Sequence, residues 1–142
     1  FTSQDPEVIR EARNARLLIV TARRREALAR SGVRADVVVG SMRDPREAGA
    51  LADYPVPPGA LVLTDGQRAG RIETAEGVET FAVAPPPERI EGTYGAGDTF
   101  AGALTWYLAR GLPLRAACER ASVHAAAVLR GINPLEAQIR LE

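Results

Sequence analysis

Residues 92–100, Gly-Thr-Tyr-Gly-Ala-Gly-Asp-Thr-Phe, combine side-chain types that can bind an anion and act on it. Gly95, Ala96 and Gly97 have minimal bulk and lead directly into Asp98. This turn is predicted to open a helix, because apolar residues follow it with helical spacing at Phe100, Leu104, Tyr107 and Leu108. The first amides of a helix lack intrahelical acceptors, and the helix dipole makes that end positive. The spacing therefore predicts an anion site at this turn.

Asp98 indicates that the site does more than bind an anion. A carboxylate in the first helical turn would repel a bound anion, so it would be a disadvantage in a site that only binds one. It is useful where it takes a proton from a nucleophile while the amides hold a phosphoryl group. The alternative is that Gly95 and Gly97 only shape a turn and that Asp98 only complements the helix dipole. The local pattern leaves both interpretations open, because short glycine motifs often occur by chance.

Residues 93–100 resemble the C-terminal signature of the ribokinase-like carbohydrate kinases, the PfkB family. That signature is usually Asp-Thr-x-Gly-Ala-Gly-Asp-x-Phe followed by a helix of small residues, which residues 101–104 supply here. The resemblance implies that the amides of Gly95, Ala96 and Gly97 form an anion hole for the transferred phosphate. It implies that Asp98 is the base that deprotonates the acceptor hydroxyl. It also implies ATP and Mg²⁺ as cofactors.

Composition narrows the function classes. The chain has 142 residues and a net charge of zero, which does not favour a nucleic-acid or membrane partner. It contains no Lys, so a lysine nucleophile or Schiff base is excluded within it. The single cysteine, Cys118, lies on an apolar helical face and is expected to be a small buried residue. No disulfide framework, membrane span or signal peptide is visible, and we expect a cytoplasmic protein.

Short apolar runs alternate with helical patterns. Buried strands are predicted at residues 17–20, 36–40 and 60–63, and a hairpin at residues 70–83. Helices are predicted from Asp5-Pro6, over residues 23–30, from Asp44, after the glycine-rich turn, and from Pro113. The fold class is therefore α/β, and the resemblance specifies a three-layer ribokinase-like sheet, mainly parallel, with a β-hairpin addition.

The resemblance assigns nucleotide contacts to several further positions. Thr64 and Gly66 follow the third strand, where the family touches the nucleotide phosphates; a plain Asp-Gly turn is the alternative. Ser41 stands near the position of a family Asn that helps to hold Mg²⁺ and phosphate through water. Ser122 occupies an Asn position against the adenine.

The positions expected to surround the metal depart from the family pattern. Asp44 and Glu47 are the candidates for the family's metal-shell Glu, and helix capping explains both equally well. Arg23-Arg24-Arg25 could contact a phosphate or simply begin a solvated helix. His124, the only histidine, is expected to pack in the interior. Many relatives hold K⁺ through an aspartate and a hydroxyl residue, but Gly92 and Tyr94 stand at those places here.

The chain begins with Phe and enters structure at once, so we interpret it as a fragment of a larger domain. Residues 1–142 would be the C-terminal nucleotide-binding and catalytic portion of a single ribokinase-like domain, with the N-terminal substrate-binding and lid portion absent. The expected function is ATP-dependent phosphorylation of a hydroxyl on a small sugar or sugar-like substrate, with the fragment alone inactive.

A non-catalytic nucleotide- or phosphate-binding module is the alternative. A Rossmann dinucleotide binder is disfavoured, because no full Gly-x-Gly-x-x-Gly follows the first strand. The expected partners are ATP or ADP and the small-molecule acceptor. A homodimer through the lid portion is left open.

Overall fold

The computed structural model describes residues 2–142, and the chain divides into two compact units. The first unit contains the chain up to Gly66 together with Gly70–Thr80. The second unit contains Gln67–Ala69 and Phe81–Glu142.

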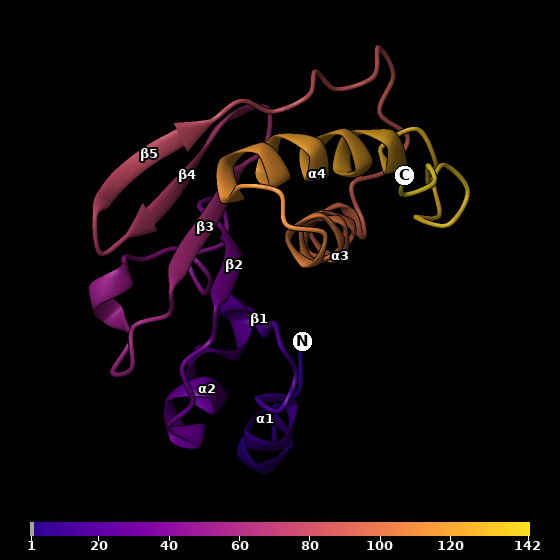
Figure 1. Cartoon of the computed structure of the whole chain (residues 1–142). Coiled ribbons are helices and arrows are strands. Elements are labelled where there is room, and N and C mark those ends of the chain that lie inside the picture. The colour runs from indigo at the N-terminus through magenta and orange to yellow at the C-terminus, as the bar shows by residue number, and fades with distance from the viewer. Residues whose placement is uncertain (1) are drawn as a thin grey trace. The chain divides into compact units, whose positions relative to one another are not determined.

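A five-stranded sheet with the order β1-β2-β3-β4-β5 lies largely in the first unit (Figure 1). Its strands are β1 (Ile19–Thr21), β2 (Val37–Ser41), β3 (Ala60–Asp65), β4 (Arg68–Thr74) and β5 (Gly77–Phe81). β1, β2 and β3 pair in parallel. Two-residue turns join β3 to β4 and β4 to β5, which brings the chain back antiparallel at each turn. The sheet is therefore mixed, with a parallel part and a hairpin addition.

The helices of the first unit are short, and the helix predicted over residues 23–30 is divided into a 3₁₀ turn and an α-helix. They are α1 (Pro6–Ala12), the 3₁₀ turn η1 (Ala22–Arg24), α2 (Arg25–Ser31) and the 3₁₀ turn η2 (Leu51–Asp53). The Asp5 carboxylate caps α1 by accepting from the Glu7 amide at 2.9 Å. Gly32 ends α2 in the left-handed conformation, with φ of 67°. α1 and α2 pack against each other.

Strand residues on both faces of the sheet are buried. Val20, Val38 and Leu61 join the apolar core that α1 and α2 help to form. Their neighbours along the strands, Val37 and Val62, are also buried. Parallel strands buried on both faces are typical of layered α/β proteins, and this confirms the predicted fold class.

The second unit is built on two helices, α3 (Ala96–Ala109) and α4 (Leu114–Val128), which pack against each other. The predicted apolar stripe of α3 is confirmed, since Phe100, Leu104 and Tyr107 are buried. Phe100 stacks on Phe81 with ring centroids 5.9 Å apart. Cys118 is buried in α4, as expected.

The helix predicted from Asp44 is wrong. Residues 42–47 form turns, and only the amides of Glu47 and Ala48 bond to the Asp44 carbonyl. The carbonyls of Glu47 and Ala48, which a longer helix would use, instead accept from the Arg25 guanidinium. A distant side chain therefore ends the helix after one turn.

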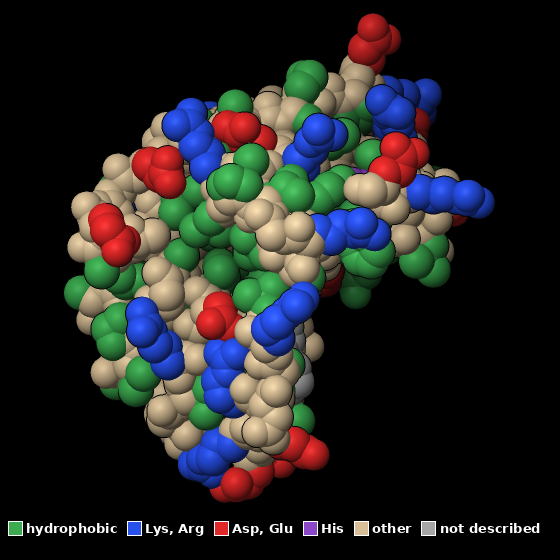
Figure 2. Space-filling model, viewed as in Figure 1, with side chains coloured by type: hydrophobic (Ala, Val, Ile, Leu, Met, Phe, Trp, Pro, Cys, Tyr) green, Lys and Arg blue, Asp and Glu red, His purple; other side chains and the backbone are tan. Residues whose placement is uncertain are grey.

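The surface of the described residues is mixed in character. Arginine and acidic side chains are interspersed over the face in Figure 2, and that face carries no continuous field of one sign. No helix within residues 2–142 has the length and apolar character needed to cross a membrane.

Candidate functional site

The N-terminus of α3 carries the predicted anion site. Gly95 is the N-cap residue in the left-handed conformation, with φ of 81°. The first i→i−4 bond of the helix runs from the Thr99 amide to the Gly95 carbonyl at 2.9 Å. The amides of Gly97 and Asp98 therefore come before the ladder begins, and helix geometry aims them outward along the axis. This end of the helix can accept a negatively charged group.

The two glycines of the turn have different surroundings. A Cβ added at Gly95 would lie 2.7 Å from the Cβ of Pro134, so the segment after α4 closes against this residue. A Cβ added at Gly97 would meet no heavy atom within 4 Å. The space over Gly97 is open to a ligand, whereas the space over Gly95 is filled.

Asp98 lies in the first turn of α3 and is exposed. Among residues 2–142, no hydrogen bond or ion pair engages its carboxylate. An unpaired carboxylate beside free helix amides can accept a proton from a group held at the same place.

A cavity of about 370 Å³ opens beside Asp98. α3 supplies Asp98 and Thr99 to its lining, α4 supplies His124, and the C-terminal segment supplies Gln138 and Ile139. The rest of the lining is largely apolar and includes Ala103, Pro134 and Leu141. A mainly apolar wall with a few polar groups is typical of ligand pockets. Sequence reasoning missed its C-terminal wall, because residues 132–142 show no periodicity.

His124 is buried, as expected for a packing histidine. Its Nε2 lies 2.9 Å from the Tyr107 hydroxyl and so links α4 to α3. Burial lowers the pKa of His124, and a backbone hydrogen bond with Ile139 opposes this shift. Burial therefore favours the neutral ring.

Ser122 is buried in α4, and its hydroxyl makes two hydrogen bonds within the second unit. It donates to the Glu119 carbonyl at 2.7 Å and accepts from the Ala84 amide at 2.8 Å. The side chain predicted to contact the nucleotide thus holds the segment that follows β5.

The first unit gathers another set of predicted residues at the carboxyl ends of its parallel strands. Ser41 and Thr64 are register partners across β2 and β3. The Thr64 hydroxyl donates to the Gly40 carbonyl at 3.3 Å, and the Ser41 hydroxyl accepts from the Arg43 amide at 3.1 Å. Gly66 has φ of 62° and lies under the Arg43 guanidinium, where an added Cβ would be 2.5 Å from Cζ. This is the edge of an α/β sheet at which ligands commonly bind.

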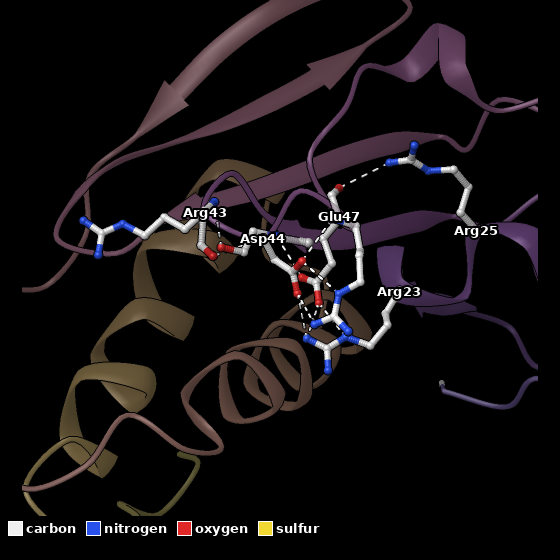
Figure 3. A network of polar contacts seen from close by, with 9 residues as sticks. Arg23, Arg25, Arg43, Asp44 and Glu47 are labelled. Atoms are coloured by element: carbon white, nitrogen blue, oxygen red, sulfur yellow. Dashed lines mark hydrogen bonds and ion pairs between the residues drawn. The ribbon is translucent and has the colours of Figure 1, made fainter.

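Asp44 and Glu47 lie at the same edge and are both engaged by arginine (Figure 3). Arg23 reaches Asp44 at 3.1 Å and Glu47 at 2.8 Å. Hydrogen bonds from Arg46 lower the pKa of Asp44 to about 2. No cluster of three or more metal-ligating side chains occurs in the part of the chain described. The two carboxylates do not fit the Mg²⁺ shell that the resemblance implies, because guanidinium groups take the positions of a metal.

The predicted residues therefore fall into two sets. Ser41, Thr64 and Gly66 lie together in the first unit, with Asp44 and Glu47. The glycine-rich turn, Asp98 and Ser122 belong to the second. Sequence reasoning noticed the three consecutive arginines without finding the partner of Arg23, because that ion pair spans more than twenty residues.

Comparison with known proteins identifies a family to which most of the chain matches. The model of the pfkB family carbohydrate kinases matches residues 7–137. A search of curated protein sequences gives no match.

Several solved structures are similar. The nucleoside kinase of Methanocaldococcus jannaschii, described as an archaeal member of the ribokinase family, has a TM-score of 0.78 at 16% identity, covering 96% of this chain and 50% of its own. Adenosine kinase of Trypanosoma brucei brucei gives 0.69 at 21% identity, covering 88% of this chain and 46% of its own. Burkholderia thailandensis nucleoside kinase with ADP-inosine gives 0.65 at 16% identity, covering 92% and 54%. Likeness at such identities establishes the fold, and this chain spans about half the length of these structures.

Proposed function

Because this chain belongs to the pfkB family of carbohydrate kinases, we propose that the protein transfers the γ-phosphoryl group of ATP to a hydroxyl of a small sugar-like acceptor. The observation that carries the proposal is the unpaired carboxylate of Asp98 beside the first amides of α3, with open space over Gly97. Fixed donors next to a free base are what phosphoryl transfer requires, since its catalysis is mainly positioning and electrostatics.

The proposed reaction uses the residues of this turn directly. Asp98 accepts the proton of the acceptor hydroxyl, whose oxygen forms a bond to the γ-phosphorus. The bond from that phosphorus to the β–γ bridging oxygen breaks, and ADP leaves. The Gly97 amide stabilises the charge on the transferring group, together with those of Gly95 and Ala96. The Ala96 amide donates to the Thr93 carbonyl at 3.4 Å and must leave this long contact to take part. We assign ATP contacts at the strand ends to Ser41, Thr64 and Gly66.

The acceptor class follows from the family and from the cavity beside Asp98. The three similar structures described above are of nucleoside and adenosine kinases, and one holds ADP-inosine. Another similar structure is of a probable sugar kinase from Rhizobium etli. A nucleoside offers both a ribose hydroxyl for Asp98 and an apolar base for a mainly apolar cavity. We therefore propose sugars and nucleosides as the first acceptors to test.

The test compares Asp98→Asn with Glu88→Gln, an exposed carboxylate outside the turn. In the full-length protein, Asp98→Asn should lower the rate of acceptor-dependent ADP release by about 10²–10⁴-fold, because a general base is lost. Binding of a non-hydrolysable ATP analogue, measured by titration calorimetry, should change little. Glu88→Gln should leave both quantities unchanged. Near-normal turnover by Asp98→Asn would contradict the proposal.

A second candidate is a non-catalytic nucleotide-binding module. The arginines at Asp44 and Glu47 favour it, because they occupy the place of the metal shell. Nucleotide binding by the wild-type full-length protein, with no ADP release for any sugar or nucleoside, would establish this alternative. We expect the 142-residue chain by itself to bind nucleotide weakly and to transfer no phosphate.

A further inference from the structure

Arg23 occupies the point at which the carboxylates of Asp44 and Glu47 converge (Figure 3). Its Nη2 lies 3.1 Å from Asp44 Oδ2 and 2.8 Å from Glu47 Oε1, and its Nε also donates to Glu47 Oε1 at 2.8 Å. One nitrogen therefore bridges two carboxylates that lie three residues apart in the chain. A cation shared by two carboxylates would lie at this point.

The other carboxylate oxygens are also occupied. Asp44 Oδ1 accepts from the amide and Nε of Arg46 at 3.0 and 3.1 Å, and Oδ2 accepts from its Nη2 at 2.9 Å. Glu47 Oε2 accepts from the Ser41 amide at 3.0 Å. Mg²⁺ requires near-octahedral oxygen ligands at about 2.0–2.1 Å, with lone pairs directed at it. These four oxygens direct their lone pairs at N–H donors.

The local charge is already balanced. Two carboxylates face two guanidinium groups, those of Arg23 and Arg46, so their formal charges cancel. A divalent ion entering the pair would meet a guanidinium at the bridging position and would have to displace it. Arginine keeps its charge under all ordinary conditions. A metal ion therefore cannot displace Arg23 by causing it to lose a proton.

The turn that carries both carboxylates also has its own anchor. Arg25, two residues beyond Arg23, donates to the Glu47 and Ala48 carbonyls at 3.3 and 2.9 Å. Its guanidinium lies 5.1 Å from the centroid of the Tyr54 ring. The turn is thus held from α2 through its backbone and does not need a metal to order it.

We infer that Arg23 is the resident cation of the Asp44–Glu47 pair, in the place where the family resemblance puts a divalent metal shell. This role concerns a metal position and does not rest on phosphoryl transfer. The pair does not bind a divalent ion in the natural protein, and removal of Arg23 opens the position.

The test measures Mn²⁺ binding without nucleotide, from the loss of the electron paramagnetic resonance signal of free Mn²⁺. The wild-type chain should show no binding at the pair. Arg23→Gln should gain a site with a dissociation constant in about the millimolar range, typical of two carboxylates completed by water. Arg46→Gln is the matched control and should gain none, because Arg23 still bridges the pair. Arg23→Lys keeps a cation and should also gain none.

Two results would overturn the inference. One is wild-type Mn²⁺ binding that Glu47→Gln abolishes, since the pair would then hold a metal with Arg23 present. The other is a folded Arg23→Gln chain that binds no Mn²⁺, since Arg23 would then not be what fills the position. Circular dichroism checks the fold of each variant, and Arg23→Met, of similar length without charge, serves as a second variant.

Discussion

Replacing Gly95 by alanine tests whether the segment after α4 closes on the turn that begins α3. The change adds one methyl group at a residue with φ of 81°. That methyl would lie 2.7 Å from Cβ and 3.0 Å from Cγ of Pro134. Carbon atoms do not approach so closely without a shift of one partner, and both the proline ring and the turn are stiff.

The expected cost has two parts. Holding a residue with a Cβ in the left-handed conformation costs about 1–2 kcal/mol. Forcing an extra methyl group into filled space costs about 1–3 kcal/mol more. Gly95→Ala should therefore lower the free energy of unfolding by about 2–5 kcal/mol.

Two other glycines separate these parts. Gly111 has φ of 88° but open space where a methyl would be added, so Gly111→Ala should cost only the conformational part, about 1–2 kcal/mol. Gly97 is helical with open space, so Gly97→Ala should raise stability by about 0.5–1 kcal/mol. It should nevertheless slow phosphoryl transfer, because its methyl would enter the space proposed for the phosphate.

Urea unfolding of the three variants measures these differences, and a double-mutant cycle with Pro134→Gly isolates the contact. The cycle should recover about 1–3 kcal/mol of the Gly95→Ala loss, while Gly111→Ala should show no coupling to Pro134→Gly. Equal losses for Gly95→Ala and Gly111→Ala, with no coupling, would refute the argument. The segment after α4 would then not close on this turn.

The remaining predictions concern pH and monovalent ions. His124 has a lowered folded-state pKa, so the unfolded chain binds more protons just below the normal histidine pKa of about 6.5. The free energy of unfolding should therefore fall as the pH is lowered from 7 to 5, by at most about 1.4 kcal/mol per unit, and His124→Gln should remove this slope in urea titrations. Activity of the full-length protein should not change when K⁺ is replaced by a bulky organic cation at constant ionic strength. The reason is that Gly92 offers no carboxylate to hold K⁺. Gly92→Asp should not create K⁺ dependence either, because an added Cβ would lie 3.1 Å from the Gly131 carbonyl oxygen. A several-fold K⁺-specific rise in the wild-type rate would contradict this prediction.

Local chemistry made most of the fold predictable. Asp5 before Pro6, Gly32 after α2 and the apolar runs that became β2 and β3 each act within a few residues, and each has its predicted outcome. The exception at Asp44 has a distant cause. Arg25 takes the carbonyls of Glu47 and Ala48 from α2, more than twenty residues earlier in the chain, and no pattern within the turn reports that.

The candidate site likewise has local features that the sequence predicts and distant contacts that it does not. The turn at the start of α3 could be predicted from residue types, because each glycine has a local reason. Gly95 adopts a left-handed conformation, and Gly97 leaves space free of side-chain atoms. The residues that pack against this turn could not be predicted from the sequence. Pro134 lies almost forty residues from Gly95, and the Ser122 hydroxyl accepts a hydrogen bond from the Ala84 amide, which lies 38 residues away.

Asp44 and Asp98 show why a family motif transfers residue types more reliably than roles. Both are aspartates at positions to which the resemblance gives chemistry. Asp44 is bound by Arg23 and Arg46, its pKa falls to about 2, and it has no lone pair left for a metal. Asp98 has no such partner among residues 2–142, and so it keeps the capacity to accept a proton. The charged partners of a carboxylate decide whether it stays available for chemistry, and those partners come from elsewhere in the fold. Of the two, only Asp98 has the unpaired carboxylate that the proposed base requires.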